Sequence, residues 1–292
     1  MSTACLKDFA GYLEESERSP LTIKNYLCDL NAFAAWFTEI NEDELEPGKI
    51  TPTDLRQFKE FLVLEGLRPS SVNRKLASLR SFIHWAQEAG LLSDGRTPAV
   101  PKTIRTEKLG PRWLDRREQN ALLRAVERGG SGRDVAIVKL LLNTGLRVRE
   151  LCDLAWRDIK IGDRKGTMAV RRGKGDKHRD VPLNKDARMA FSSLGYSSHI
   201  GFDERVFKGQ RGPLTPMGVQ ILLRKYAQAA KLEDVSPHSL RHTFCKNLID
   251  AAVGIEKVAA LAGHENLETT RRYCAPSLRD LQEAVERIGD HD

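Results

Sequence analysis

The sequence predicts a mainly α-helical fold with one small antiparallel β-sheet, divided between two domains. Apolar residues recur at spacings of three and four along most of the chain, which is the pattern of amphipathic helices. One stretch after Ile159 instead contains two short runs typical of strands. The chain has 292 residues, more than one minimal core requires. We expect a helical domain over 1–94, a linker over 95–111 and an α+β domain over 112–292.

Three amphipathic helices are expected in the first domain. The first follows Ser19 and Pro20, the second begins near Thr53, and the third begins after Pro69 and ends at Gly90. Serine and threonine cap helix starts, proline suits the first turn, and glycine favours a helix end. The apolar stripes contain Ile23, Tyr26, Leu27, Leu30, Phe33, Ala34, Phe37, Leu55, Phe58, Phe61, Leu62, Val72, Leu76, Leu79, Phe82, Ile83 and Ala86. Together they predict a small helical bundle.

The third helix carries Arg74, Lys75 and Arg80 outside its apolar stripe. Charged residues in such positions commonly form a solvated face. They can also bind the phosphates of a nucleic acid, an interpretation that depends on whether the second domain binds DNA as well. Both interpretations stay open from these residues alone.

A proline-rich stretch follows the bundle. The segment 95–111, GRTPAVPKTIRTEKLGP, has three prolines, four basic residues and no periodicity. This composition is typical of an extended linker. A basic linker can follow a phosphate backbone.

The second domain is expected to begin and end with helices. Asp115 and Glu118 have the spacing of a capping box, which predicts a helix start. Another helix is expected over 135–143, and Thr215 with Pro216 begins a later one.

The predicted sheet lies between these helices. The segments 167–170 and 179–183 are expected to be short strands. They flank Gly173-Lys174-Gly175-Asp176-Lys177, which is expected to form a hairpin turn.

Charge favours a nucleic-acid partner. The formal net charge is +7 and the pI is about 9.2. The 47 basic residues face 40 acidic ones, so the excess is moderate and does not prove such a partner.

The sequence indicates a cytoplasmic protein. Its five cysteines lie far apart without a CxxC pattern, which favours a reducing compartment. The N-terminus MSTACLKDFAGYLEE has no signal-peptide layout, and no apolar run approaches the ~20 residues that a membrane span needs.

Arg147 is the first candidate for chemistry. It follows a Thr-Gly break at a helix start, where its side chain can point out of the fold while Leu151 and Leu154 anchor the helix. A surface arginine in an ordinary ion pair is the alternative. Glu150, one turn later on the same face, is interpreted as a buried support for Arg147 and not as a general base.

Lys174 is the second candidate. It lies between two glycines at the tip of the expected hairpin, from which its ammonium group can reach into a groove. A lysine that only adds solubility is the alternative.

The segment HSLRH contains a third group of candidates. His238 and Arg241 are three residues apart, so they share a helix face and can contact one phosphate together. His238, His242 and Cys245 also have a spacing that zinc could use. We disfavour a metal because no HExxH pattern is present and Arg241 would place a positive charge beside it.

Tyr273 is a candidate nucleophile. A short helix is expected over 266–272, with Asn266 as its cap. His264 follows Gly263, which can end the preceding helix and expose the imidazole. A phenol with a pKa near ~10 reacts poorly at neutral pH, so Tyr273 needs neighbouring cations. A packing tyrosine and a capping or core histidine are the alternatives.

These motifs resemble, in order and spacing, those of the tyrosine recombinase (phage integrase) family. They are TGLR at 144–147, GKG at 173–175, HSLRH at 238–242, LAGH at 261–264 and Tyr273, nine residues after His264. The segments SPLTIKNY and SSVNRKLASLRSF resemble the core-binding domain of Xer-type recombinases. The resemblance covers nearly the whole chain and implies a helical core-binding domain followed by an α+β catalytic domain.

The resemblance implies roles for four of the candidates at the scissile phosphate. Arg147 and Arg241 would bind its non-bridging oxygens. His238 and His264 would hydrogen-bond it and assist proton transfer.

Strand cleavage itself would depend on two further residues. Tyr273 would attack phosphorus, leaving a 3′-phosphotyrosyl bond and a free 5′ hydroxyl, and Lys174 would protonate the departing 5′ oxygen. Attack by the partner strand then leads through a Holliday junction to exchange. Because the phosphotyrosine conserves the bond energy, the family needs neither a cofactor nor a metal.

The resemblance also implies partners. Double-stranded DNA recombination sites would be encircled by the two domains, with a tetramer on two sites and a possible second recombinase, for integration, excision or dimer resolution. An apolar stripe over 278–288 predicts a terminal helix that packs on its own core or docks on the neighbouring protomer. Since the bundle begins at the N-terminus, a simple Xer-like enzyme is favoured over one with an arm-site domain.

Two other functions fit the same residues. A type IB topoisomerase-like enzyme would cleave and reseal one duplex without exchange. A DNA-binding regulator would keep the fold without the chemistry, although the intact residue set argues against it.

Overall fold

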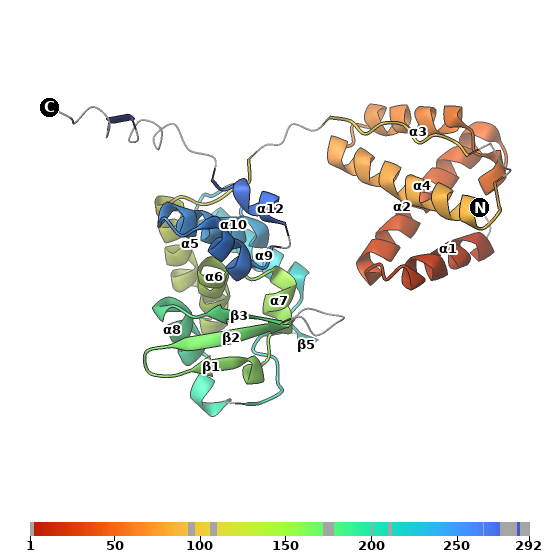
Figure 1. The fold of residues 1–292 in the computed structure, drawn as a ribbon. Helices are drawn as coiled ribbons and strands as arrows, with labels where there is room; N and C mark the ends of the chain where they lie inside the picture. The colour runs from red at the N-terminus through yellow and green to blue at the C-terminus, as the bar shows by residue number, and fades with distance from the viewer. Residues whose placement is uncertain are drawn as a thin grey trace. The chain divides into compact units, whose positions relative to one another are not determined.

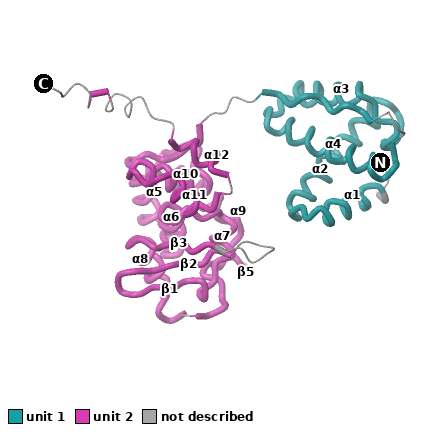
Figure 2. Tube along the Cα trace, in the orientation of Figure 1, with its two compact units in different colours: residues 1–108 teal, residues 109–292 magenta. Residues whose placement is uncertain are grey.

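The protein is described by a computed structural model covering residues 3–92, 97–105, 110–171, 178–199, 201–209, 212–264, 266–274 and 285–286. The chain divides into two compact units, Met1–Lys108 and Leu109–Asp292 (Figure 2). The expected linker over 95–111 includes residues outside the described ranges, and its boundaries stay a prediction.

The first unit is a bundle of helices (Figure 1). Its elements are α1 (Thr3–Glu15), α2 (Pro20–Asn41), the 3-10 helix η1 (Pro47–Lys49), α3 (Pro52–Leu64) and α4 (Pro69–Glu88). The last three α-helices match the three predicted ones, and α1 is an addition to them. Ser19 and Thr51 cap α2 and α3 through their side chains, and Gly90 has a φ of 69° just after α4. The expected caps therefore set the helix boundaries to within two residues.

Aromatic side chains fill the core of this bundle. Phe9 of α1 contacts Phe82 and Trp85 of α4, with ring centroids 5.3 and 5.4 Å apart. Phe33 of α2 contacts Phe58 of α3 with centroids 4.9 Å apart. Such pairs bury large apolar areas, so they join all four α-helices into one core.

The second unit is mainly helical with two small antiparallel sheets, which confirms the predicted fold class and adds one sheet. It begins with α5 (Arg116–Gly129), α6 (Gly132–Thr144) and α7 (Val148–Asp153). The middle part contains η2 (Trp156–Asp158), β1 (Ile159–Ile161), β2 (Gly166–Arg171), β3 (His178–Pro182), α8 (Lys185–Ser193), η3 (Tyr196–Ser198), β4 (Lys208–Gly209) and β5 (Gly212–Pro213). The final elements are α9 (Pro216–Ala229), α10 (Pro237–Asp250), α11 (Ile255–Ala262) and α12 (Leu267–Arg271).

The larger sheet has the order β1-β2-β3, with both pairs antiparallel. Met168 lies opposite Ile159 on one side and Val181 on the other, and all three side chains are buried. This register directs the apolar face of the sheet into the core of the unit. The predicted hairpin turn lies outside the described residues.

Helix α6 is the centre of the second unit. It packs against α5, α8 and α10. Its residues Ile137, Leu140 and Leu141 are fully buried. Because α6 ends directly before Gly145, its packing also fixes the segment that leads to Arg147.

Among the helices of the described ranges, none combines the length and apolar character needed to cross a membrane.

Candidate active site

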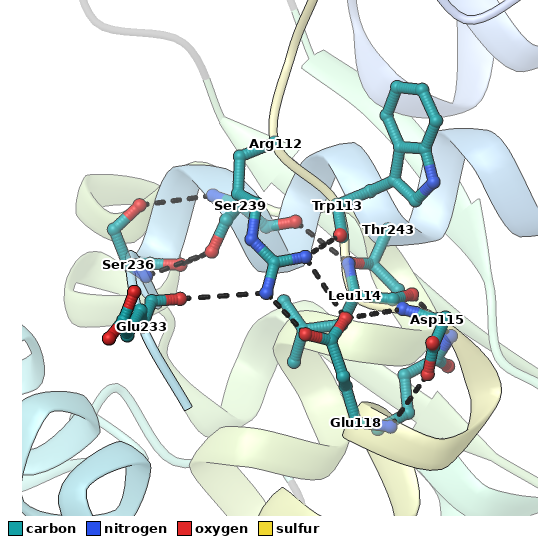
Figure 3. A network of polar contacts seen from close by, with 10 residues as sticks. Arg112, Trp113, Leu114, Asp115, Glu118, Glu233, Ser236, Ser239 and Thr243 are labelled. Carbon is teal, nitrogen blue, oxygen red and sulfur yellow. Dashed lines mark hydrogen bonds and ion pairs between the residues drawn. The ribbon is translucent and has the colours of Figure 1, made fainter. Parts of the chain in front are cut away.

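Helix α10 carries the candidates of the HSLRH segment. Its N-cap is Ser236, whose Oγ accepts a hydrogen bond from Ser239 N at 3.1 Å, while Ser239 Oγ accepts one from Ser236 N at 2.8 Å (Figure 3). This reciprocal capping satisfies backbone donors at the helix start. His238, Arg241 and His242 follow at helical spacing and therefore lie on one side of α10.

The segment that leads into α5 holds α10 in place. Arg112 pairs with Glu118 through two hydrogen bonds of 3.0 and 2.5 Å (Figure 3). Leu114 N donates to Thr243 Oγ1 at 2.9 Å, in the residue that follows His242 (Figure 3). Residues 112–114 are therefore tied both to the start of α5 and to α10.

Two arginines far apart in sequence are fixed by neighbouring carbonyl groups. Arg241 is 2% exposed and donates to the carbonyl oxygens of Gly145 and Ala262, each at 2.5 Å. Arg147, the N-cap of α7, donates to the Gly263 oxygen at 2.8 Å, and its side chain is 43% exposed. The end of α11 thus brings both guanidinium groups to one place.

Glu150 orients the more exposed arginine. Its carboxylate accepts hydrogen bonds from Arg147 Nη1 at 3.0 Å and Arg147 N at 2.8 Å, and it pairs with both Nη atoms of Arg179. Burial acts to raise the pKa of Glu150, but the bonds from Arg179 and Arg147 outweigh it and hold the pKa at about 2. Glu150 is therefore ionised at neutral pH and supports Arg147, as predicted.

The sharp end of α11 places His264. Gly263 adopts a left-handed conformation with φ 66°, as expected for a helix-ending glycine. His264 follows, and its Nδ1 lies 2.8 Å from Thr270 Oγ1 on α12. Asn266 caps α12 through its side chain, which confirms that predicted helix start.

The site brings positive charge together around the buried Arg241. Burial, followed by the nearby charge of Arg147, lowers the pKa of Arg241 to about 10. Burial and the charge of Arg241 lower the pKa of His238 and bring that of His264 to about 4. Because these groups disfavour one another's charged forms, an anion bound among them would stabilise the charged forms. The four side chains therefore form a site suited to a phosphate.

Tyr273 lies beside this cluster but is buried. It is 1% exposed, and its ring is 6.3 Å from that of His264. Burial raises the pKa of Tyr273 and Cys245 adds to the effect, while the charges of Arg241 and Arg272 oppose it. The expectation that neighbouring cations activate the phenol is therefore not met in this structure, because desolvation has the larger effect on the pKa of Tyr273.

The other predicted site residues differ in how they are placed. Lys174 lies outside the described residues. Arg74 and Lys75 both pair with the buried carboxylate of Asp29, and the Lys75 side chain is only 14% exposed. Arg80 is exposed on the same helix, α4. Of these three candidate DNA-binding residues, Arg80 and Arg74 are the more accessible.

Two residues outside the predicted set contact the site. Arg179 lies on β3 two residues before the buried Val181, so both side chains point to the same face of the strand. A basic residue on the buried face of a predicted strand is a signal by which the sequence could have indicated Arg179. His242 forms a hydrogen bond with the Tyr273 hydroxyl. Its spacing from His238 suggests a shared helix face or a zinc ligand, but no pattern in the sequence indicates its contact with Tyr273. Within the described ranges, no group of three or more His, Cys, Asp or Glu side chains could hold a metal ion.

A groove of about 630 Å³, lined by arginines and carboxylates, begins at Arg147. Its lining includes Arg149, Arg157, Arg171 and Arg205. Three of these arginines pair with aspartates, whereas Arg149 is exposed in the first half of α7. The lining also contains Glu150, Asp153, Asp158 and Asp203, so its arginines exceed its carboxylates by one, and the exposed Arg149 adds positive charge next to the phosphate site.

Comparisons with known proteins agree with this geometry. The Phage integrase family matches residues 112–279, and the N-terminal SAM-like domain of phage integrases matches residues 6–90. The tyrosine recombinase XerC of Xanthomonas axonopodis pv. citri is 31% identical over 91% of this chain and 90% of its own length. The tyrosine recombinase XerA of Pyrococcus furiosus is 31% identical over 97% of this chain and 93% of its own length.

The fold is shared with solved recombinase structures. The crystal structure of the XerH site-specific recombinase bound to palindromic difH, after cleavage, has a TM-score of 0.74 at 20% identity and covers 96% of this chain and 85% of its own. The crystal structure of XerA recombinase has a TM-score of 0.54 at 25% identity and covers 98% of both chains. With its clustered arginines and histidines beside a tyrosine, and with these relatives along nearly its whole length, the chain belongs to the phage integrase family of tyrosine recombinases, enzymes that break and rejoin DNA strands.

Proposed function

We propose that this recombinase cleaves duplex DNA through Tyr273, whose hydroxyl attacks the scissile phosphate to give a 3′-phosphotyrosyl bond and a free 5′ hydroxyl. A partner strand's hydroxyl then attacks that bond, and exchange proceeds through a Holliday junction. One observation carries the proposal. Arg147 and Arg241 are 94 positions apart, yet they donate to adjacent carbonyls at the end of α11. Helix α11 in turn packs against α12, the helix that precedes Tyr273.

The roles of the site residues follow from their chemistry. Arg147 and Arg241 hold the non-bridging phosphate oxygens, since a guanidinium group donates two parallel hydrogen bonds. His238 and His264 add hydrogen bonds to the same phosphate. Lys174 protonates the departing 5′ oxygen.

Duplex DNA is the proposed partner of both units. Arg74, Lys75 and Arg80 contribute phosphate contacts from the first unit, and the groove that begins at Arg147 contributes them from the second. Support comes from relatives: XerH is bound to difH, and a lambda integrase dimer is bound to a COC′ core site. We extend this to a tetramer on two recombination sites, with a second recombinase as a possible partner.

A trapping experiment tests the chemistry. The DNA site is first obtained by enriching a random duplex pool on the Tyr273→Phe protein. A duplex of that sequence is then prepared with a nick next to the cleavage point. When it is cut, the short fragment that carries the free 5′ hydroxyl dissociates, so cleavage cannot be reversed and the covalent adduct accumulates. Wild type should form an adduct that survives denaturation, and Tyr273→Phe should form none.

Tyr226→Phe is the matched control, because Tyr226 is equally buried but lies on α9, where its hydroxyl bonds to Asp134. It should form the adduct. A wild-type protein that binds the site without forming an adduct would indicate a regulator. Relaxation of a supercoiled plasmid without strand exchange would indicate a topoisomerase.

Assembly is tested by shortening the chain. The apolar stripe over 278–288 lies almost wholly outside the described residues. We propose that this segment docks on a neighbouring protomer. Deleting 277–292 should leave binding to one site intact and weaken cooperative binding in a gel-shift titration, and unchanged cooperativity would contradict the proposal.

A further inference from the structure

His242 has a position that no role described above uses. Its Nδ1 is hydrogen-bonded to the Tyr273 hydroxyl, and the two rings are 5.3 Å apart. On its other side the imidazole meets the ring of His238 edge to face, with centroids 4.2 Å apart. His242 is therefore held between the phosphate site and the nucleophile.

The protonation states define the direction of this hydrogen bond. Burial, followed by the charges of His238 and Arg272, lowers the pKa of His242 to about 4, so its imidazole is neutral at pH 7. Burial raises the pKa of Tyr273, so the phenol keeps its proton. A neutral Nδ1 that faces a phenol can accept its hydrogen bond. In the tautomer that carries its proton on Nε2, Nδ1 therefore offers a lone pair to the proton that Tyr273 must lose.

We propose that His242 is a catalytic residue that takes the proton of Tyr273 during DNA cleavage. The proposal deepens the proposed function and rests on it. As an electron pair of the Tyr273 oxygen forms the bond to phosphorus, the O–H bond breaks and its proton moves to His242 Nδ1. The bond from phosphorus to the 5′ oxygen breaks at the same time, and that oxygen receives its proton from the general acid, for which Lys174 is proposed. Rejoining returns the proton from His242 to Tyr273.

The other histidines of the site are occupied differently. His264 uses its Nδ1 on Thr270. His238 faces the charges of Arg241 and Arg147, which suits hydrogen bonding to a phosphate. Among the described histidines, His242 is the one whose ring is hydrogen-bonded to the hydroxyl oxygen of Tyr273.

Asparagine separates proton transfer from positioning. In His242→Asn, a side-chain oxygen can occupy the place of Nδ1 and accept the hydrogen bond, but an amide takes up no proton in the working pH range. His242→Ala removes both functions. His199→Gln is the control, because His199 lies elsewhere in the same unit, against Trp156 and the Gly195 carbonyl.

The rate of adduct formation on the nicked duplex should fall about 100-fold in His242→Asn and His242→Ala, the size expected for loss of a general base. The DNA dissociation constant and the melting temperature serve as checks on folding and should match wild type in His242→Asn. His199→Gln should react at the wild-type rate.

The pH profile gives a second readout. The charged or titratable groups facing His242 are His238, Arg272, Arg241, His264 and Tyr273. Wild type should be nearly independent of pH above neutrality, whereas His242→Asn should speed up with rising pH, because solvent base must then take the proton.

The reaction rates of the variants distinguish proton transfer by His242 from other roles. A wild-type rate for His242→Asn would overturn proton transfer and leave a positioning role. A faster His242→Ala would show that the hydrogen bond restrains the tyrosine instead. If wild type and His199→Gln formed no adduct, the proposed function would fail, and the inference would fail with it.

Discussion

Glu150 and Arg179 form a two-pronged ion pair, with both Nη atoms 2.8 Å from carboxylate oxygens. Arg179 also donates from Nε to the Leu261 carbonyl at 3.2 Å. Glu150 on α7 accepts from Arg147 as well, so its carboxylate joins two arginines that both donate to carbonyls at the end of α11. The pair therefore helps, together with the Gly263 carbonyl, to hold the Arg147 guanidinium in place.

Replacing Arg179 with alanine should slow DNA cleavage about 100-fold, the effect of a misplacement of about 1 Å in a catalytic group. The unfolding free energy should also fall, by about 3–5 kcal/mol, because the Glu150 carboxylate loses its main partner. Adduct formation and urea unfolding measure the two effects. Arg133→Ala, which breaks the pair with Asp134 away from the site, should leave cleavage unchanged. Full activity in Arg179→Ala would contradict the positioning role.

The depressed pKa of Glu150 predicts a pH-dependent contribution to stability. Its ordinary value is 4.5 and the folded value is about 2, so the stabilisation is complete above about pH 4.5 and is lost as pH falls toward 2. Glu150→Gln should therefore melt below wild type at neutral pH, with a gap that narrows only below about pH 4.5. Melting curves between about pH 7 and pH 3 measure this gap. Glu268→Gln, in an exposed pair, should show almost none. A gap that is constant with pH would contradict the ionic origin.

Much of the fold could be predicted from the sequence, because a helix cap depends on residues that are close together in the chain. Ser19, Asp115 and Thr215 each cap a helix at the expected place. The short β4–β5 ribbon was missed, since two residues in each strand leave no periodic pattern. Element boundaries thus followed capping chemistry, and the smallest sheet depended on tertiary packing.

The site was predictable in its residue types and not in its contacts. Arg147 lies at the start of α7, Arg241 within α10 and His264 just after α11. No local pattern in the sequence states that three carbonyls would bring the arginines together. The burial of Tyr273 and its bond to His242 likewise depend on how α10 and α12 pack. A sequence does not fix such distances.

Gly145 should not tolerate a side chain. Its φ is 62°, and a Cβ there would lie 2.3 Å from the ring of Phe244. Gly145→Ala should therefore cost about 1–3 kcal/mol for the overlap, in addition to the strain of a left-handed residue. Gly195→Ala isolates the strain, because its φ is 84° but the nearest atom is 3.7 Å away. Urea unfolding should rank Gly145→Ala clearly below Gly195→Ala, and equal stabilities would show that Phe244 moves aside.

The two arginines of the site should respond differently to lysine. Arg241 is buried and divides its guanidinium between two carbonyls, a geometry that one ammonium group reproduces poorly. Arg147 is partly exposed and keeps a carboxylate neighbour in Glu150. Arg241→Lys should therefore lose both cleavage, by about 100- to 1,000-fold, and folding stability. Arg147→Lys should lose cleavage but little stability.

Adduct formation on the nicked duplex and thermal unfolding of the same proteins test this difference. DNA affinity should stay near wild type in both variants, since many phosphate contacts contribute to binding. Equal melting temperatures for the two variants would contradict the structural role of Arg241. Undiminished cleavage in Arg241→Lys would show that a point charge is sufficient, because the phosphate would then need no two-pronged donor at this position.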